Sequence, residues 1–370
     1  MASHEKRVFI LGAGSSIGHS HNQFPNIKEF FVKAKNIGLD LERDYSQINE
    51  YTISLYDRSI LDRRNRIDIE SLFTNVEIEI ERRPSHNLIQ IRQQLLRLIQ
   101  LVLIGLEQKI DSKRSEYNDL FDQLHSNDTI ITFNWDLLFD DVLWREKALE
   151  VAPTLSGCPK PQYTNFLTEL SIYHDFHQAH GIDRPYTLWP ADTGQYLKMH
   201  GSVDWFYCAN ESCYGHNKVF PLLNPTADHY CSECHEQVQL LIIPPILNKG
   251  YRNYPLIRRI WNLAAQEIRS ATELIIWGYS LPPTDFYSDW LMRQARNAPL
   301  SKLSIINPEA IDKSKTKIGP IVGRFRDMFR KKSTHPEVII YEYFSDYPHN
   351  DSRNKYRIGW PLMATNLRVT

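Results

Sequence analysis

The chain has 370 residues, 42% of them hydrophobic and 24% charged, which is the composition of a folded globular protein with an ample core. Its formal net charge of −1 excludes a strong overall field that would attract nucleic acid or an anionic membrane. The opening apolar run, residues 8–11, is too short for a signal peptide, and no later run reaches the roughly 18 apolar residues of a membrane span. We therefore expect a cytoplasmic protein that does not contact a membrane.

The chain is expected to open with a strand, a glycine turn and a helix. Residues 7–11 are apolar and β-branched, and they run into a turn made of Gly12, Ala13, Gly14 and Ser15. A helical pattern then follows Pro25 over residues 27–34. Glycines at this spacing let the backbone approach a pyrophosphate, whose charge a helix N-terminus favours. A plain tight turn is the alternative, because the next glycine, Gly18, is one position later than in the dinucleotide fingerprint.

A short-chain dehydrogenase is a competing interpretation of the same turn. Its chemistry needs a tyrosine and a lysine one helical turn apart. The pair that we considered, Tyr214 and Lys218, lies inside a cysteine-rich segment where no helix face is expected. The sequence therefore disfavours a dehydrogenase.

Residues 40–127 are dense in charge and have a helical period. The apolar positions that share one face are Leu88, Ile91, Leu95, Leu98 and Val102. The polar positions on the other faces are Arg92, Gln93, Arg97 and Gln100. This pattern predicts a solvated helical layer packed on a core. Asp68 and Glu70 are suited to the start of one of its helices, because acidic groups stabilise a first turn.

Further short apolar strands are predicted over residues 129–133, 196–199, 240–243, 273–277 and 303–306. Helix-length segments, 254–269 and 285–296, separate the last three. The polar or glycine residues that follow these strands are Asn134, Asp136, His200, Gly278, Ser280 and Asn307. Strands alternating with helices predict an α/β fold with an open parallel sheet, which binds ligands at the carboxyl ends of its strands.

A cluster of cysteines indicates a metal site. Its members are Cys208, Cys213, Cys231 and Cys234. Four thiolates in two pairs suit a closed, structural zinc site. The first pair is spaced more widely than usual, so one of His216, His229 and His235 can replace a cysteine. Cys158 stands apart and is expected to be an inert, buried thiol, and a redox role for the cluster is disfavoured by its hydrophilic setting.

In their order along the chain, these motifs resemble the sirtuin family, and more closely its divergent Sir2-like branch from bacterial anti-phage systems. The matching runs are residues 12–15, 132–136, 200–201, 278–281 and 306–307, with the four cysteines between His200 and Gly278. The resemblance covers about residues 7–310. It implies a Rossmann-like open parallel sheet of the sirtuin (DHS-like) type over 1–310, with a helical insertion at 40–127 and a zinc module at 200–240. A C-terminal extension, 311–370, is expected to pack on the sheet, because residues 337–341 read as a final strand.

The resemblance also implies NAD as the substrate, held by a defined set of residues. Gly12, Ala13, Gly14 and Ser15 would hold the diphosphate, and Gly278, Ser280 and Asn307 would belong to the cofactor site, the last two at the adenosine half. Asn134 and Asp136 would frame the nicotinamide ribose, with His200 as the catalytic base. Alternatives remain for each: His200 as an ordinary core histidine, and Asn134 as a strand-end turn residue.

Two departures from protein-deacylating sirtuins concern the peptide. Residues 18–25 hold no Asp-Phe-Arg run, and Ile243-Pro244-Pro245-Ile246 stands where the family's Phe-Gly-Glu run lines the acyl-lysine channel. Prolines remove backbone donors that an added peptide strand would need. We therefore expect an NAD glycohydrolase that uses water as acceptor. A lysine deacylase or ADP-ribosyltransferase is the first alternative, and a non-catalytic NAD or ADP-ribose sensor is the second.

The basic stretch over residues 311–334 is expected to be a solvated face, with nucleic acid as a weaker alternative supported only by Phe325 and Phe329 as stacking residues. Because an unrestrained NAD hydrolase would poison its own cell, we expect control. By analogy with the family, that control is self-assembly or a separate ATPase or nuclease-like partner chain.

Overall fold

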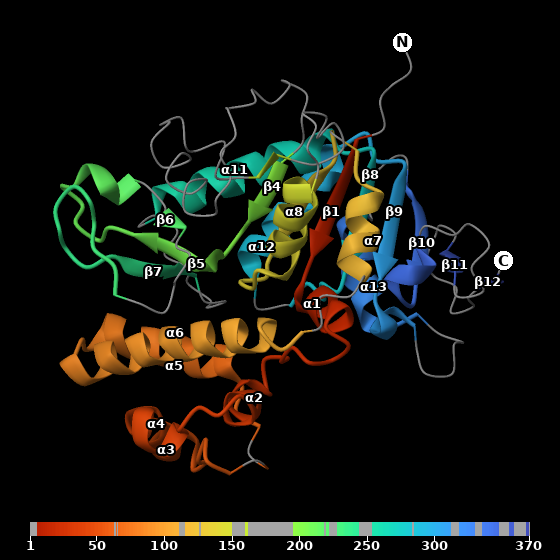
Figure 1. Ribbon diagram of the computed structural model, residues 1–370. Coiled ribbons are helices and arrows are strands. Elements are labelled where there is room, and N and C mark those ends of the chain that lie inside the picture. Colours follow the sequence, from red (N-terminus) through yellow and green to blue (C-terminus); the bar gives the residue numbers. More distant parts are fainter. Residues whose placement is uncertain are drawn as a thin grey trace.

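The computed structural model describes a large part of the chain, which Figure 1 shows as coloured ribbons. The described residues are 6–62, 64, 66–110, 115–125, 127–149, 160–161, 195–217, 220–221, 228–243, 254–282, 285–311, 318–329, 335–347, 355–358 and 368–369. Cys158 and residues 244–249 of the predicted peptide-channel segment lie outside them.

A single large sheet forms the centre of the molecule (Figure 1). In sheet order its described strands are β12 (Arg368–Val369), β11 (Lys355–Ile358), β10 (Glu337–Tyr341), β9 (Lys302–Ile306), β8 (Glu273–Trp277), β1 (Arg7–Leu11), β2 (Thr129–Thr132), β4 (Gln195–Lys198) and β3 (Lys160–Pro161). From β10 to β3 every neighbouring pair is parallel, whereas the pairs β10–β11 and β11–β12 are antiparallel. The expected open parallel sheet is confirmed.

The central strands are rich in apolar residues because helices cover both faces of the sheet. Along β1, Phe9 and Leu11 join one core, and Val8 and Ile10 join the other. The helices of the first core include α7 (Glu116–Asp122) and α8 (Leu138–Leu149). Those of the second are α11 (Pro255–Ser270), α12 (Phe286–Met292) with its 3-10 continuation η3 (Arg293–Asn297), and α13 (Pro320–Phe329). A continuous apolar run in the sequence is thus divided between two cores.

The chain reverses its direction across the sheet at β1. It passes from β1 to β2 and β4 on one side and then returns to β8 on the other side of β1. In open α/β sheets, ligands bind at such a switch point, beyond the carboxyl ends of the strands.

The helix after the glycine turn differs from the prediction. Helix α1 (Ala13–His19) begins inside the turn itself, and the pattern after Pro25 forms a second helix, α2 (Phe30–Asn36). The apolar residues at 27–34 therefore do not make the helix that faces the turn.

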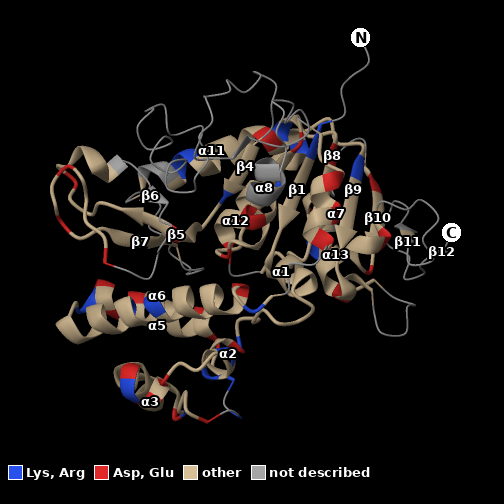
Figure 2. Cartoon of the chain, in the orientation of Figure 1, with Lys and Arg blue, Asp and Glu red and all other residues tan. Residues whose placement is uncertain are grey.

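A helical layer lies beside the sheet, as predicted for residues 40–127. It contains α3 (Leu41–Asp44), α4 (Ser46–Tyr56), α5 (Ile69–Arg82) and α6 (His86–Glu107). Asp68 caps α5 by accepting a hydrogen bond from the backbone of Ser71, which confirms its predicted place. Figure 2 shows both acidic and basic residues on these helices, as expected of a partly solvated layer.

Helix α6 buries more of its surface than the sequence pattern predicts. Gln100 was expected on a solvated face, but it is buried and donates to the main-chain oxygen of Val203 at 2.8 Å. Helix α6 is long and apolar enough to be a candidate membrane span. However, half of its most apolar 18-residue stretch is buried inside the protein. It packs against α2, α4, α5 and the strand that follows His200, which is how a core helix behaves.

A small antiparallel sheet replaces one predicted member of the parallel sheet. The strand predicted at 240–243 is β7 (Gln239–Ile242), and it pairs with β5 (Gly201–Tyr207), which also pairs with β6 (Phe220–Pro221). The prediction that this strand belongs to the parallel sheet is wrong, because its partner is the chain immediately after His200. This sheet supports the cysteine cluster.

The described part of the C-terminal segment is continuous with the large sheet. Strand β10 pairs in parallel with β9, and α13 packs on the second core. Phe325 and Phe329 are buried there, so they offer no stacking platform. Arg324 donates to the main-chain oxygen of Ser280 at 2.8 Å, so this member of the basic stretch has a structural partner.

Candidate functional site

A cavity of about 240 Å³ lies at the carboxyl ends of β1, β2, β4 and β8, at the switch point of the sheet. The residues that line it are Ala13, Ser16, Phe24, Pro25, Ile27, Phe30, Glu70, Leu103, Phe133, Asn134, Trp135, Asp136, His200, Gly278, Tyr279, Ser280, Pro282 and Asp285. Three separate strand ends therefore bring Asn134, His200 and Ser280 to one cavity.

Asn134 is fixed by its side-chain nitrogen. Its Nδ2 lies 3.0 Å from the main-chain oxygen of Gly12, 2.9 Å from the hydroxyl of Ser16 and 3.3 Å from that of Ser15. A carbonyl oxygen can only accept, so the atom facing Gly12 must be the amide nitrogen. The amide oxygen of Asn134 is then the atom that remains for a ligand.

Asp136 also lines the cavity and is linked to Asn134 through the Ser16 hydroxyl. Its carboxylate accepts from the Ser16 hydroxyl at 2.7 Å and from the backbone of Leu138 at 3.2 Å. Burial raises the pKa of Asp136, although Lys198 and these hydrogen bonds oppose the shift. Because Asp136 is 7% exposed and its carboxylate already accepts from two protein donors, it positions Ser16 and, through it, Asn134.

Tyr117 completes a set of hydroxyls under the glycine turn. Its phenol oxygen lies 2.8 Å from the Ser15 hydroxyl and 3.1 Å from that of Ser16, and burial raises its pKa. Its ring packs against Trp277 at a centroid distance of 5.2 Å and stacks on His19 at 4.4 Å. A buried aromatic thus fixes both serines.

His200 follows β4 and is almost fully buried at the wall of the cavity, with 4% of its surface exposed. Its ring lies 5.3 Å from that of Phe133 and 6.1 Å from that of Trp261. The main-chain oxygen of His200 accepts from Ile243 at 2.8 Å, which joins this strand end to β7. An imidazole held between aromatic rings has a fixed direction, which a catalytic base needs.

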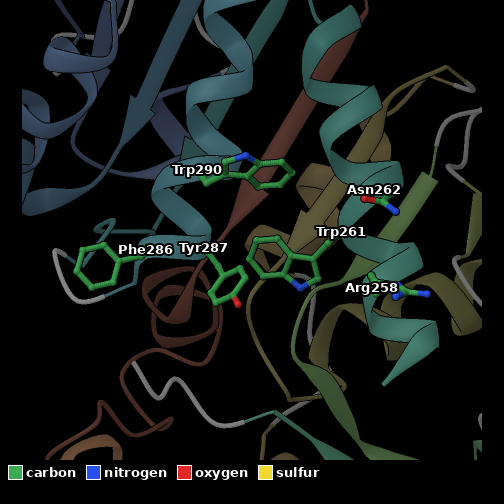
Figure 3. A pocket seen from close by; sticks show the side chains of 6 residues that line it. All are labelled: Arg258, Trp261, Asn262, Phe286, Tyr287 and Trp290. Carbon is green, nitrogen blue, oxygen red and sulfur yellow. The ribbon is translucent and has the colours of Figure 1, made fainter. Parts of the chain in front are cut away.

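Trp261 packs against Phe133 and His200 of this cavity and also lines a second pocket. Its indole nitrogen donates to the main-chain oxygen of Met199 at 3.0 Å, and its ring lies 6.0 Å from that of Tyr287. Beyond it, an open pocket of about 410 Å³ is lined by Arg258, Asn262, Phe286, Tyr287 and Trp290 (Figure 3). The aromatic packing around His200 therefore extends to an exposed face of α11 and α12.

The glycines of the turn are required by close backbone packing. A Cβ atom on Gly12 would lie 2.6 Å from the Cα of Tyr279, and one on Gly14 would lie 2.7 Å from the Cα of Gly278. Gly278 itself has a φ of +65°, which favours glycine. These contacts seat the loop after β1 on the loop after β8 and so shape one wall of the cavity.

Some of the predicted cofactor residues line the cavity, and others do not. Ala13, Gly278 and Ser280 line the cavity, whereas the side chain of Ser15 is buried and donates to the main-chain oxygen of Gly12 at 2.7 Å. Asn307 is not among the described lining residues, and its side chain caps a 3-10 turn, η4 (Pro308–Ala310), by accepting from Glu309 at 2.8 Å. The roles of all the predicted residues towards a cofactor stay predictions.

The four predicted cysteines meet beside β5. All four Sγ atoms lie within 4.8 Å of one another, with Cys208 and Cys234 at 3.5 Å and Cys213 and Cys231 at 3.7 Å. A tetrahedral zinc with Zn–S bonds of about 2.3 Å needs sulfur separations of about 3.8 Å. The cluster therefore fits a structural zinc site, as the sequence predicts.

The neighbouring histidines have other contacts. Nδ1 of His216 lies 2.8 Å from the main-chain oxygen of Cys208, and the ring of His229 packs on Phe206 at 5.6 Å. Among the described residues, the group that can hold a metal contains only the four cysteines. The alternative in which a histidine replaces a cysteine is therefore not favoured.

Comparison with known proteins gives structural likeness without sequence likeness. No family model matches the chain, and no curated protein matches it. It is similar to a Sir2 enzyme from a study of Sir2 mechanism and regulation, with 13% identity over 89% of this chain and 94% of the other and a TM-score of 0.34. It is also similar to a serine-to-alanine mutant of a Sir2 homologue bound to ADP-ribose, with 12% identity over 90% and 96% of the chains and a TM-score of 0.31.

A third similar structure is a Sir2 protein in complex with an inhibitor, 2′-O-acetyl-ADP-ribose and a deacetylated peptide. It has 14% identity over 89% of this chain and 94% of the other, with a TM-score of 0.29. The parallel α/β sheet is defined by its own strand order.

Several residues of the site had no individual role assigned from the sequence. Ser16, Phe133 and Tyr279 line the cavity, and Phe133 and Tyr279 stack with their rings nearly parallel at 4.3 Å. Ser16 follows the glycine turn directly, so its position was a usable signal. No sequence signal pointed to Tyr117, because 102 residues separate it from Ser15, which it contacts.

Proposed function

We propose that this chain is a Sir2-type enzyme that cleaves the nicotinamide–ribose bond of NAD with water as the acceptor. The observation that carries the proposal is one cavity at the switch point of the sheet that is lined by both Asn134 and His200. The reaction converts NAD⁺ and water into ADP-ribose, nicotinamide and a proton.

The residues of the cavity suit the charges that form in this reaction. As the nicotinamide leaves, its bond electrons go with it and the ribose develops oxocarbenium character. The amide oxygen of Asn134 carries partial negative charge and is held in place through its nitrogen, so it can stabilise that ribose or accept from a water or hydroxyl beside it. His200 can take the proton that the attacking water releases.

The choice of water rests on the sequence. A protein-deacylating site needs a channel for the acyl-lysine, and the runs that form it in sirtuins are absent at residues 18–25 and 243–249. Residues 18–25 are instead part of α1 and its following turn, and Phe24 and Pro25 line the cavity. An apolar wall at this place supports a site for NAD that lacks a peptide channel.

Purified protein incubated with NAD alone tests the proposal. We expect release of nicotinamide and ADP-ribose in equal amounts without any acylated peptide. Asn134→Ala and His200→Ala should each lower kcat/KM by about 10²-fold or more. Ser304→Ala, which changes a buried serine of β9 away from the cavity, is the control.

Two other results would replace this function. Turnover that strictly requires an acylated peptide would make the chain a deacylase. NAD binding without nicotinamide release, with an affinity that His200→Ala leaves unchanged, would make it a sensor.

We further propose that the enzyme is a regulated effector of the anti-phage type, since free NAD hydrolysis harms the cell that makes it. Control would come from self-assembly or from a separate ATPase or nuclease-like partner. Light scattering of the protein alone and with candidate partners tests this, and a fully active lone monomer would contradict it.

A further inference from the structure

A buried lysine lies beneath the cavity and has no role in the function proposed above. Lys198 is the last residue of β4, two positions before His200, and its side chain is 1% exposed. Its ammonium group donates to the main-chain oxygen of Asp136 at 2.6 Å and to Oδ2 of Asp140 at 2.9 Å. Lysine is rarely buried unless it is paired, so these contacts need a reason.

The surroundings of Lys198 carry more negative than positive charge. Asp140 on α8 also accepts from the hydroxyl of Tyr196 on β4 at 2.9 Å, and Asp136 and Asp204 face the lysine from the loop after β2 and from β5. Glu107 on α6 also lies near the lysine and accepts from the backbone of Leu137 at 2.6 Å, but burial raises the pKa of its carboxyl group, so the negative charge comes from the aspartates. Burial lowers the pKa of Lys198, but the carboxylates outweigh it, and the pKa is raised. The lysine therefore stays charged.

One of the two bonds from Lys198 connects it to Asn134 through Asp136 and Ser16. The peptide oxygen that it holds belongs to Asp136, whose carboxylate accepts from Ser16, and Ser16 in turn accepts from Asn134. The backbone of Lys198 belongs to β4, the strand that His200 follows. A single side chain thus joins the segment carrying one proposed catalytic group to the segment carrying the other.

We propose that Lys198 is a positioning residue, which fixes the loop that carries Asn134 to the strand end that carries His200. Its bond to Asp140 balances its charge, so that it can be buried. Its bond to the main-chain oxygen of Asp136 holds the loop that carries Asn134. The effect of Lys198 on turnover rests on the proposed function, whereas its effect on the loop that carries Asn134 does not.

These two roles separate in a double variant. Lys198→Met alone leaves Asp140 buried without its cation and should lower the unfolding temperature markedly. Adding Asp140→Asn removes that charge while an amide oxygen remains to accept from Tyr196, so the unfolding temperature should recover. The bond to the Asp136 peptide is still missing, so kcat/KM for NAD should stay about 10²-fold below that of the wild type.

A matched control exists in the same sheet. Lys302 on β9 pairs with Glu273 on β8 at 2.9 Å, and neither lines the cavity. Lys302→Met/Glu273→Gln makes the same chemical change there and should leave kcat/KM within about threefold of the wild type. A double variant at 198 and 140 that regains activity together with stability would overturn the positioning role.

Hydrogen exchange provides a readout that does not depend on NAD turnover. In the wild type the backbone N–H groups of Leu137 and Leu138 are bonded to Glu107 and to Asp136. We expect faster exchange over residues 134–138 in the double variant at 198 and 140, and wild-type exchange in the control. Unchanged exchange there would overturn the positioning role, whereas a wild type that leaves NAD intact would overturn only the proposed function.

Discussion

The hydroxyl of Ser16 accepts a hydrogen bond from the side chain of Asn134 at 2.9 Å and donates one to Asp136 at 2.7 Å. Ser16 therefore links the amide of Asn134 to the carboxylate of Asp136, and all three residues line the cavity. The direction of both bonds fixes the amide oxygen of Asn134 as the group offered to a ligand.

Ser16→Ala should weaken NAD turnover while leaving the fold intact. Asn134 keeps its bond to Gly12, but Asp136 loses a donor that lowers its pKa. We expect kcat/KM to fall about tenfold or more, with the acidic limb of its pH profile moved to higher pH. Ser304→Ala is the control, and an unchanged pH profile for Ser16→Ala would show that the link has no part in turnover.

Gly201→Ala should be far more damaging than Gly38→Ala. Both glycines have positive φ values, +76° and +94°, so both substitutions strain the backbone by about 1 kcal/mol. A Cβ on Gly201 would also lie 2.0 Å from the main-chain oxygen of Leu241, whereas nothing lies within 4 Å of one on Gly38. Denaturant unfolding should give a loss at Gly201 larger by a few kcal/mol. Because Gly201 follows His200, kcat should fall there too; equal losses at the two sites would contradict the predicted clash.

Metal analysis should find one zinc per chain. Cys234→Ser should lower the zinc content and the unfolding temperature, because a four-thiolate site loses a ligand and the segment around it depends on the metal. His235→Asn keeps a residue that tolerates the positive φ at this position, and it should retain full zinc. Loss of zinc in the histidine variant, or its retention in the cysteine variant, would require a different ligand set.

Asp204 should make stability depend on pH in a defined direction. Burial raises its pKa to about 6, above the value of about 4 expected in the unfolded chain. The folded state therefore binds the proton more tightly, so this contribution is full below about pH 4 and is lost as pH rises through about 6. The unfolding temperature of the wild type minus that of Asp204→Asn should fall between pH 4 and pH 7. A difference that is constant or rises with pH would contradict this.

Much of the sheet and the metal site could be predicted from local sequence. The strands at 7–11, 129–132, 273–277 and 302–306 are rich in apolar residues, because each is buried on both faces. The cysteine spacing predicted the cluster, since thiolates arranged in pairs have few other uses. Asn134 and His200 each follow a predicted strand. Because the carboxyl ends of parallel strands lie at the same edge of a sheet, the sequence placed both residues at that edge.

Other features depend on which segments meet. The strand at 239–242 is as apolar as its neighbours, but pairing with β5 removes it from the parallel sheet. Gln100 looks solvated on a helical wheel and is buried against Val203. The supports of the site, Tyr117 under the serines and Lys198 under Asp136, act across sequence separations of 102 and 62 residues. Local sequence patterns predict whether a residue is buried. The partner that accepts from a buried hydroxyl or ammonium group is set by tertiary packing, because that partner lies far away in the sequence.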